Sequence, residues 1–153
     1  MQNTRPGASS LRRGRFSELG RIYLVTAVTQ AREPRFADWR LGRLVVEQMR
    51  AADAAGGLRS LAFVVMPDHF HWLFELGDQP LDAAVMRMKS LSAKAVNAAL
   101  GRSGQVWQRG FHDRAIRRED DIRAVARYVI ANPLRAGLVQ RVGEYPLWDA
   151  AWL

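Results

Sequence analysis

The chain has 153 residues, with 23 Lys and Arg against 15 Asp and Glu, and its formal net charge is +8. A chain of this length favours one domain, and it can bury roughly two-thirds of its unfolded surface without help from cross-links. Because the chain has no cysteine, disulfide frameworks, thiolate-bound zinc or iron–sulfur clusters and a thiol nucleophile are excluded. Any metal must therefore be held by His, carboxylate or amide groups.

The charge pattern favours nucleic acid over a membrane as partner. No apolar run approaches the roughly 18 residues that cross a bilayer, and the Arg-rich start lacks the apolar segment of a secretory signal. We therefore expect a cytoplasmic protein with no membrane partner. All basic residues except Lys89 and Lys94 are Arg, which binds phosphate bidentately and stacks on bases. An Arg-rich codon bias is the alternative explanation.

The first half of the chain predicts one strand, one helix and a hairpin. Residues 1–19 are basic without a periodic pattern, and we interpret them as a flexible arm ahead of a single domain over residues 20–153. Residues 21–30 are rich in β-branched side chains and predict a strand. Residues 38–55 place apolar side chains at helical spacing and predict an amphipathic helix.

The next segments complete the predicted order of elements. Residues 58–66 and 69–76 predict two strands that form a hairpin around Pro67-Asp68. Residues 80–100 predict a helix with Pro80 in its first turn, where the missing N–H does no harm.

The last part of the chain predicts one more strand and one more helix. Residues 106–117 predict the strand, and residues 119–132 predict a helix that begins with acidic side chains and ends before Pro133. Residues 134–153 form a tail. The whole order predicts an α+β ferredoxin-like sandwich, in which an antiparallel sheet carries its helices on one face.

Two of the three histidines lie in one predicted strand. His69 and His71 are at positions i and i+2, which point to the same face about 7 Å apart along the strand. Two imidazoles in this arrangement can converge on one divalent metal, while Phe70 packs on the opposite face. Two strand histidines that bind nothing are the alternative.

The last predicted helix carries a phenol and an amide on one strip. At about 100° per residue, Tyr128 and Asn132 fall one turn apart at the edge of its apolar face. Either residue alone is typical of rim packing or of a helix end. With the histidines they form a set of two imidazoles, one amide and one phenol. A metal held by His69, His71 and Asn132 could polarise a phosphate, which Tyr128 could then attack.

Four segments carry a resemblance to a known family: MPDHFHWLFEL (66–76), GQVWQRGFHDRAIR (104–117), ARYVIANPLRAGLV (126–139) and EYPLWDAAW (144–152). In this order and spacing they resemble the REP-associated tyrosine transposases, within the wider H-hydrophobic-H (HUH) family of single-tyrosine transposases. The resemblance extends from about residue 21 to the end of the chain. It implies a ferredoxin-like core, dependence on Mg²⁺ or Mn²⁺, single-stranded and hairpin DNA substrates (REP-like palindromes), and a covalent 5′-phosphotyrosine intermediate.

The resemblance assigns a role to each residue of the set. It makes His69 and His71 the metal-binding pair, Tyr128 the nucleophile and Asn132 the amide ligand. We therefore predict a metal-dependent, site-specific endonuclease and strand transferase for single-stranded DNA. Two alternatives stay open: a domesticated protein that binds hairpin DNA or RNA without cutting it, and a metal-dependent phosphodiesterase that uses water.

Further residues are candidates for supporting the site or contacting DNA: Asp68, Trp107, Arg109, His112 and Arg114. Asp68 could orient one of the histidines through its carboxylate, or simply belong to the Pro-Asp turn. Trp107 could stack on a base or pack in the core. Residues 116–119 contain no glycine that could act as a hinge for exchanging the last helix between subunits. We therefore expect a monomer, with a dimer as the alternative.

Overall fold

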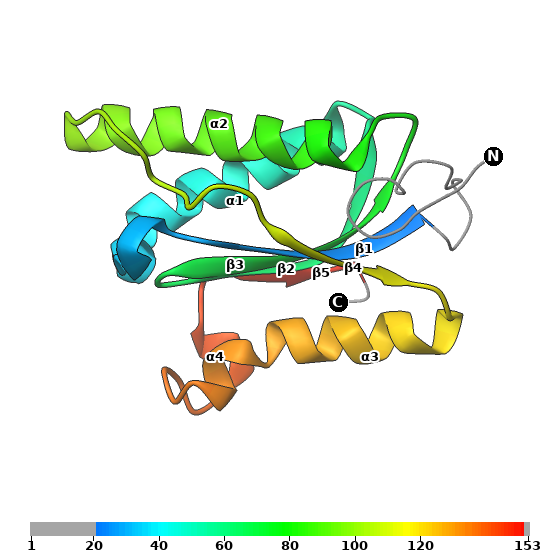
Figure 1. The fold of residues 1–153 in the computed structure, drawn as a ribbon. Helices are drawn as coiled ribbons and strands as arrows, with labels where there is room; N and C mark the ends of the chain where they lie inside the picture. The colour runs from blue at the N-terminus through cyan, green and yellow to red at the C-terminus, as the bar shows by residue number, and fades with distance from the viewer. Residues whose placement is uncertain (1–20, 152–153) are drawn as a thin grey trace.

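Five antiparallel strands form a sheet at the centre of the fold (Figure 1). The computed structural model describes residues 21–151, so the predicted basic arm over residues 1–19 lies outside the described residues. The strands are β1 (Ile22–Val28), β2 (Leu58–Met66), β3 (His69–Leu76), β4 (His112–Ile116) and β5 (Trp148–Ala150). Their order across the sheet is β4-β1-β3-β2-β5, which makes β3 the central strand.

Helices cover both faces of this sheet. They are α1 (Trp39–Ala54), α2 (Leu81–Leu100), α3 (Glu119–Ile130) and the short α4 (Asn132–Arg135), with 3-10 turns η2 (Gln30–Arg32), η3 (Arg35–Ala37) and η4 (Val142–Glu144). In Figure 1, α1 and α2 lie on one side of the sheet and α3 and α4 on the other. The predicted α+β fold with an antiparallel sheet is confirmed. The prediction that the helices share one face is wrong.

The apolar pattern of β2 explains why a second helical layer is needed. Every residue from 61 to 66 is buried, whichever face its side chain takes. Phe63 and Val65 pack in the cluster of α1 and α2 side chains, whereas Val64 and Met66 pack in the cluster that contains α3 side chains. A strand that is apolar on both faces must be covered on both. None of the helices within residues 21–151 is long and apolar enough to cross a membrane.

Local sequence signals place several element ends where they were predicted. The strands β2 and β3 have the predicted bounds and join at Pro67-Asp68. Asp38 caps α1, because its carboxylate accepts the backbone N–H of Arg40 at 3.0 Å. Gly101 ends α2 with a φ of +64°, a left-handed conformation that glycine adopts without strain.

The predicted fourth strand is too long, because β4 begins only at His112. In the connection before it, Trp107 pairs with Thr29 in an isolated bridge. Gly110 then turns the chain with a φ of +73°. The sheet ladder therefore starts after this turn, and the preceding residues pack as a loop.

The predicted last helix breaks in two. The helix α3 ends at Ile130, and Pro133 lies in the first turn of α4. Proline has no backbone N–H to continue the hydrogen-bond ladder, and its ring clashes with the carbonyl four residues back, so one continuous helix through this point is not stable. Beyond α4, the tail adds β5 to the edge of the sheet beside β2.

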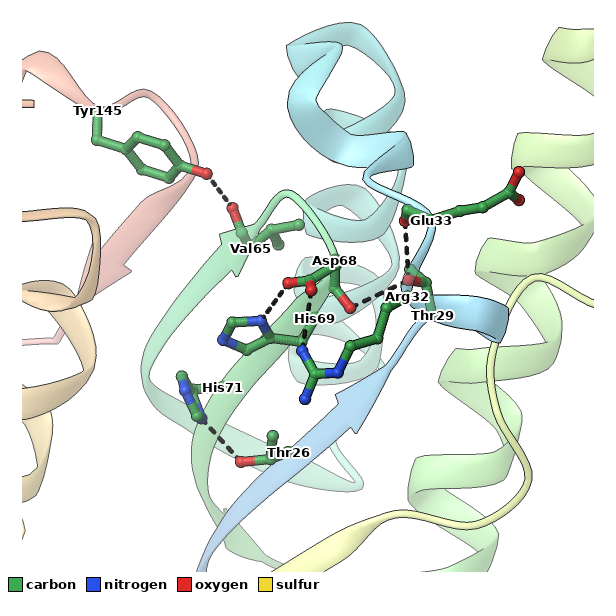
Figure 2. Close-up of polar contacts among 9 residues, drawn as sticks. All are labelled: Thr26, Thr29, Arg32, Glu33, Val65, Asp68, His69, His71 and Tyr145. Atoms are coloured by element: carbon green, nitrogen blue, oxygen red, sulfur yellow. Dashed lines mark hydrogen bonds and ion pairs between the residues drawn. The ribbon is translucent and has the colours of Figure 1, made fainter. Parts of the chain in front are cut away.

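Tyr145 in this tail is hydrogen-bonded to the sheet, and its ionisation makes the stability of the fold depend on pH. Its hydroxyl donates to the carbonyl oxygen of Val65, and burial raises the pKa of Tyr145 to about 12 (Figure 2). A tyrosine in the unfolded chain ionises near pH ~10, so the stability that the neutral phenol contributes is complete below ~10 and is lost as the pH rises towards ~12.

We expect Tyr145→Phe to lower the free energy of unfolding by about 1–2 kcal/mol at neutral pH, because the Val65 carbonyl loses its donor. The variant should also lose part of the decline in stability above pH ~10. Urea unfolding at neutral and alkaline pH measures both effects. An unchanged alkaline decline in the variant would show that Tyr145 does not cause it.

Candidate active site

The central strand presents the two histidines on the face that α3 covers. Leu73 packs in the α3 cluster, whereas Phe70 and Trp72 pack under α1 and α2. His69 and His71 alternate in register with Leu73 and therefore share its face. Their ring centroids are 4.9 Å apart, with the rings nearly perpendicular. The structure thus places the two imidazoles together, as the alternation predicts.

Each imidazole is held through its Nδ1 atom (Figure 2). Nδ1 of His69 lies 2.7 Å from Oδ1 of Asp68, and Nδ1 of His71 lies 2.8 Å from the hydroxyl of Thr26. The carboxylate accepts a hydrogen bond from the Nδ1–H of His69, which leaves the lone pair of that ring on Nε2. In Figure 2 the other nitrogen of each ring faces the space between the two rings. This is the orientation that two ligands of one ion require.

Burial and neighbouring charge set the protonation states of His71 and Asp68. Burial, which is the largest cause, and the neighbouring charges of His69 and Arg135 together lower the pKa of His71 to about 4. His71 is therefore neutral near pH 7, with a lone pair to donate. Burial alone would raise the pKa of Asp68, but hydrogen bonds and charge interactions with His69 and Arg32 outweigh it, and the net shift is downward. Asp68 is therefore an anion.

Tyr128 lies on α3 opposite His71. The two ring centroids are 6.4 Å apart, and the Tyr128 side chain is 53% exposed. Both residues line a groove of about 710 Å³ between α3 and strands β1 and β4. The guanidinium of Arg135 sits 3.8 Å from the centre of the phenol ring and donates to the Tyr128 carbonyl oxygen at 2.7 Å. The phenol is therefore accessible, next to a histidine and beside a fixed positive charge.

Asn132 is placed differently from the prediction. It begins α4 after the break at Ala131, so it does not share a continuous helix with Tyr128. No hydrogen bond or ring contact within residues 21–151 joins it to the histidines. Its Nδ2 atom is buried and makes no hydrogen bond with the described residues. An amide in this position has unsatisfied bonding capacity, and a half-turn of the group would present its oxygen instead.

These residues fit a divalent cation as a mixed donor set. Among residues 21–151, no group of three or more His, Cys, Asp or Glu side chains could hold a metal ion. The candidate set instead combines two imidazoles with an amide whose bonding capacity is unsatisfied. Imidazole suits later transition metals, and amide oxygen suits Mg²⁺ and Mn²⁺. Both donor types therefore bind divalent cations.

The remaining candidates divide between the core and the surface. Trp107 is 4% exposed and donates from Nε1 to the Ser92 hydroxyl, so it packs in the core and is not available to stack on a base. His112 is exposed on β4, where it pairs with Thr26. Arg114 lines the groove, whereas Arg109 is exposed in the connection before β4.

Sequence reasoning missed three residues that shape the site: Thr26, Arg32 and Arg135. Thr26 reaches His71 because β1 and β3 pair with these two residues in register. Arg32 contacts Asp68 at 2.9 Å across 36 positions of sequence. Neither contact has a local signal, because both depend on which strands pair. Arg135 follows Tyr128 by seven positions, which is helical spacing, and this was the one signal available.

Comparison with known proteins relates this chain to a family. The family model described as "Transposase IS200 like" matches residues 20–132. The REP-associated tyrosine transposase of Escherichia coli K12 is 32% identical over 87 residues, a match that covers 56% of this chain and 50% of that relative. The match therefore spans about half the length of the relative.

Solved structures agree on the fold. The structure of a REP-associated tyrosine transposase bound to a REP hairpin has a TM-score of 0.69 and 24% identity, and the match covers 84% of this chain and 76% of that one. A crystal structure from Deinococcus radiodurans R1 has a TM-score of 0.52 at 20% identity, over 71% of this chain and 87% of that one. Because the family model matches residues 20–132, which is most of this chain, the chain belongs to the IS200-like transposase family.

Proposed function

We propose that this chain is a metal-dependent endonuclease and strand transferase that acts on single-stranded DNA beside a hairpin. The observation that carries the proposal is the position of Tyr128, an exposed phenol 6.4 Å from His71 in a groove. Membership of the transposase family supports it, as does the hairpin-bound relative. The deciding test is whether a labelled hairpin oligonucleotide forms a covalent adduct with the protein that survives denaturation.

The proposed reaction exchanges one phosphate ester for another. The Tyr128 oxygen loses its proton to solvent and bonds to phosphorus, and the bond from phosphorus to the 3′ oxygen breaks. The 3′ oxygen takes up a proton, and the 5′ end stays on Tyr128. A second 3′-OH can reverse these steps and join two strands without ATP, because the ester bond is conserved. The Arg135 guanidinium, 3.8 Å from the phenol ring centre, places a positive charge beside the attacking group.

In this proposal His69, His71 and Asn132 hold the cation. When bound, Mn²⁺ or Mg²⁺ would withdraw electron density from a phosphate oxygen. The chain contributes the orientation of both imidazoles, through Asp68 and Thr26. The tyrosine helix α3 packs on β2 and β3 of its own chain, which supports a monomer.

The groove supports a path for the unpaired strand. Arg114 and Arg117 line it, both are exposed, and within the described part of the chain neither has a carboxylate partner. Guanidinium groups without acidic partners are free to bind phosphate. Since the groove also contains Tyr128 and His71, a strand held there would pass the reacting groups.

The double variant Arg114→Ala/Arg117→Ala tests this path. We expect its affinity for single-stranded DNA to fall about tenfold at low salt. The slope of log affinity against log salt should become shallower by about 1.4, which is roughly 0.7 for each lost phosphate contact. Fluorescence anisotropy over a salt series measures both quantities.

Arg43→Ala/Arg87→Ala is the matched control, because both residues are exposed on α1 and α2 at the opposite face of the sheet and neither has a carboxylate partner within the described part of the chain. The control should keep the wild-type slope. If the two double variants show the same slope, the groove does not carry the DNA.

A further inference from the structure

We propose that Arg32 is a positioning residue for the candidate cation site, acting on His69 through Asp68. The inference rests on the proposed function in one respect, namely that His69 is a ligand. Figure 2 draws no hydrogen bond or ion pair between Arg32 and either imidazole. Its guanidinium contacts Oδ2 of Asp68 at 2.9 Å, and Oδ1 of the same carboxylate lies 2.7 Å from Nδ1 of His69.

The carboxylate of Asp68 is fixed because both of its oxygens are engaged. A carboxylate with one partner can rotate and share its lone pairs with water, and it then holds a histidine ring loosely. With Arg32 on one oxygen and His69 on the other, the carboxylate plane is fixed by two charge-assisted contacts. Ligand histidines commonly depend on such an outer carboxylate for ring orientation. In this site the carboxylate of Asp68 is in turn held by Arg32.

The backbone that carries Arg32 is unusual. Ala31 and Arg32 have φ values of +57° and +52°, in the left-handed region that residues other than glycine seldom adopt. Two such residues in succession persist only where surrounding contacts hold them. The turn is closed by the Arg32 N–H, which donates to the Thr29 carbonyl at 3.0 Å. The turn is also bonded to the connection before β4, because the Gln30 N–H donates to the Val106 carbonyl at 2.8 Å.

Thr29 fixes this turn relative to Asp68. It is fully buried, and its backbone N–H donates to the Asp68 carbonyl at 2.9 Å. Its hydroxyl donates to the Glu33 carbonyl at 2.8 Å, just beyond the turn (Figure 2). A single buried residue therefore holds the turn that presents Arg32 and the hairpin that presents Asp68. The strained backbone places the Arg32 side chain where it meets the carboxylate.

The chain offers a closely matched ion pair as control. Arg32 and Asp68 are 2.9 Å apart with side chains 64% and 24% exposed, and Arg59 and Glu75 are 2.9 Å apart with side chains 66% and 25% exposed. Exposed pairs of this kind contribute little to stability. The two pairs therefore differ in what the carboxylate touches next, since only Asp68 is hydrogen-bonded to a candidate ligand in the described contacts.

The test measures Mn²⁺ affinity of the full chain without DNA, by electron paramagnetic resonance of free Mn²⁺. Arg32→Asn is the variant of choice, because asparagine accepts a left-handed backbone; Arg32→Gly repeats the test if that variant folds poorly. We expect Arg32→Asn to weaken Mn²⁺ binding about fivefold, Arg59→Asn to leave it unchanged, and Asp68→Ala to weaken it roughly 10–100-fold. In the Asp68→Ala background, Arg32→Asn should add nothing, because its route to His69 is gone.

The outcomes separate this inference from the proposed function. If His69→Ala and His71→Ala lose Mn²⁺ binding while Arg32→Asn binds as wild type, the role of Arg32 is overturned and the site stands. An additive loss in the Asp68→Ala background also overturns it, because Arg32 would then act by another route. If neither histidine variant changes Mn²⁺ affinity, the inference fails together with the cation site. Loss of DNA binding by Arg32→Asn with unchanged Mn²⁺ affinity would make Arg32 a DNA contact instead.

Discussion

Tyr128→Phe should remove all covalent protein–DNA adduct and all strand transfer. The substitution deletes one oxygen from a side chain that is 53% exposed, so the fold and the hairpin affinity should be retained. A phenylalanine cannot form the phosphate ester on which both cleavage and joining depend. Denaturing gels with labelled hairpin oligonucleotides measure the adduct, and thermal unfolding checks the fold.

Tyr145→Phe is the control for this variant. It also removes one phenolic oxygen, and it should be less stable yet form the adduct at the wild-type level. The result separates the alternative functions. If the protein is a phosphodiesterase that uses water, the Tyr128→Phe variant should still cut DNA. If the protein only binds DNA, neither the wild type nor the variant should form an adduct. An active Tyr128→Phe variant would remove the mechanism proposed here.

His71→Ala should reduce DNA cleavage by at least about 100-fold, as expected when a cation ligand or its orientation is lost. Its affinity for hairpin DNA should change less than about twofold, because phosphate contacts by Arg supply most of the affinity. Single-turnover cleavage in chelator-treated buffer with added Mg²⁺ or Mn²⁺ measures the rate, and anisotropy measures the binding.

His112→Ala provides the matched comparison. His112 and His71 both pair with Thr26, from the strands on either side of β1, but only His71 lines the groove with Tyr128. The His112 variant should cut at close to the wild-type rate. Wild-type cleavage by His71→Ala under these conditions would count against the cation site.

Alternation and helical spacing predicted much of this molecule. The pair His69 and His71 comes together because a period of two is a property of any strand, whatever its neighbours. The hairpin of β2 and β3 follows from an apolar run, a Pro-Asp turn and a second apolar run, which are all local signals. The family motifs were also local, and the family match confirms the resemblance that they indicated.

The errors arose where the answer depended on distant contacts. Because β2 is apolar on both faces, each face needs a helical layer, and no local pattern in the sequence indicates which helix covers which face. The separation of Asn132 from α3 has a local cause, Pro133, which has no N–H to continue the α3 ladder and whose ring clashes with the carbonyl four residues back. Thr26 and Arg32 could not be predicted, because strand pairing brings Thr26 to His71 and Arg32 to Asp68.

The most direct test of the account is to map the adduct. The full chain is incubated with a hairpin oligonucleotide that has a single-stranded flank, with and without Mn²⁺ or Mg²⁺, then denatured, digested and analysed by mass spectrometry. The account predicts DNA on Tyr128, within the peptide of residues 128–135, and only when the divalent cation is present. DNA on Tyr23 or Tyr145, or cleavage that leaves no tyrosine modified, would contradict it.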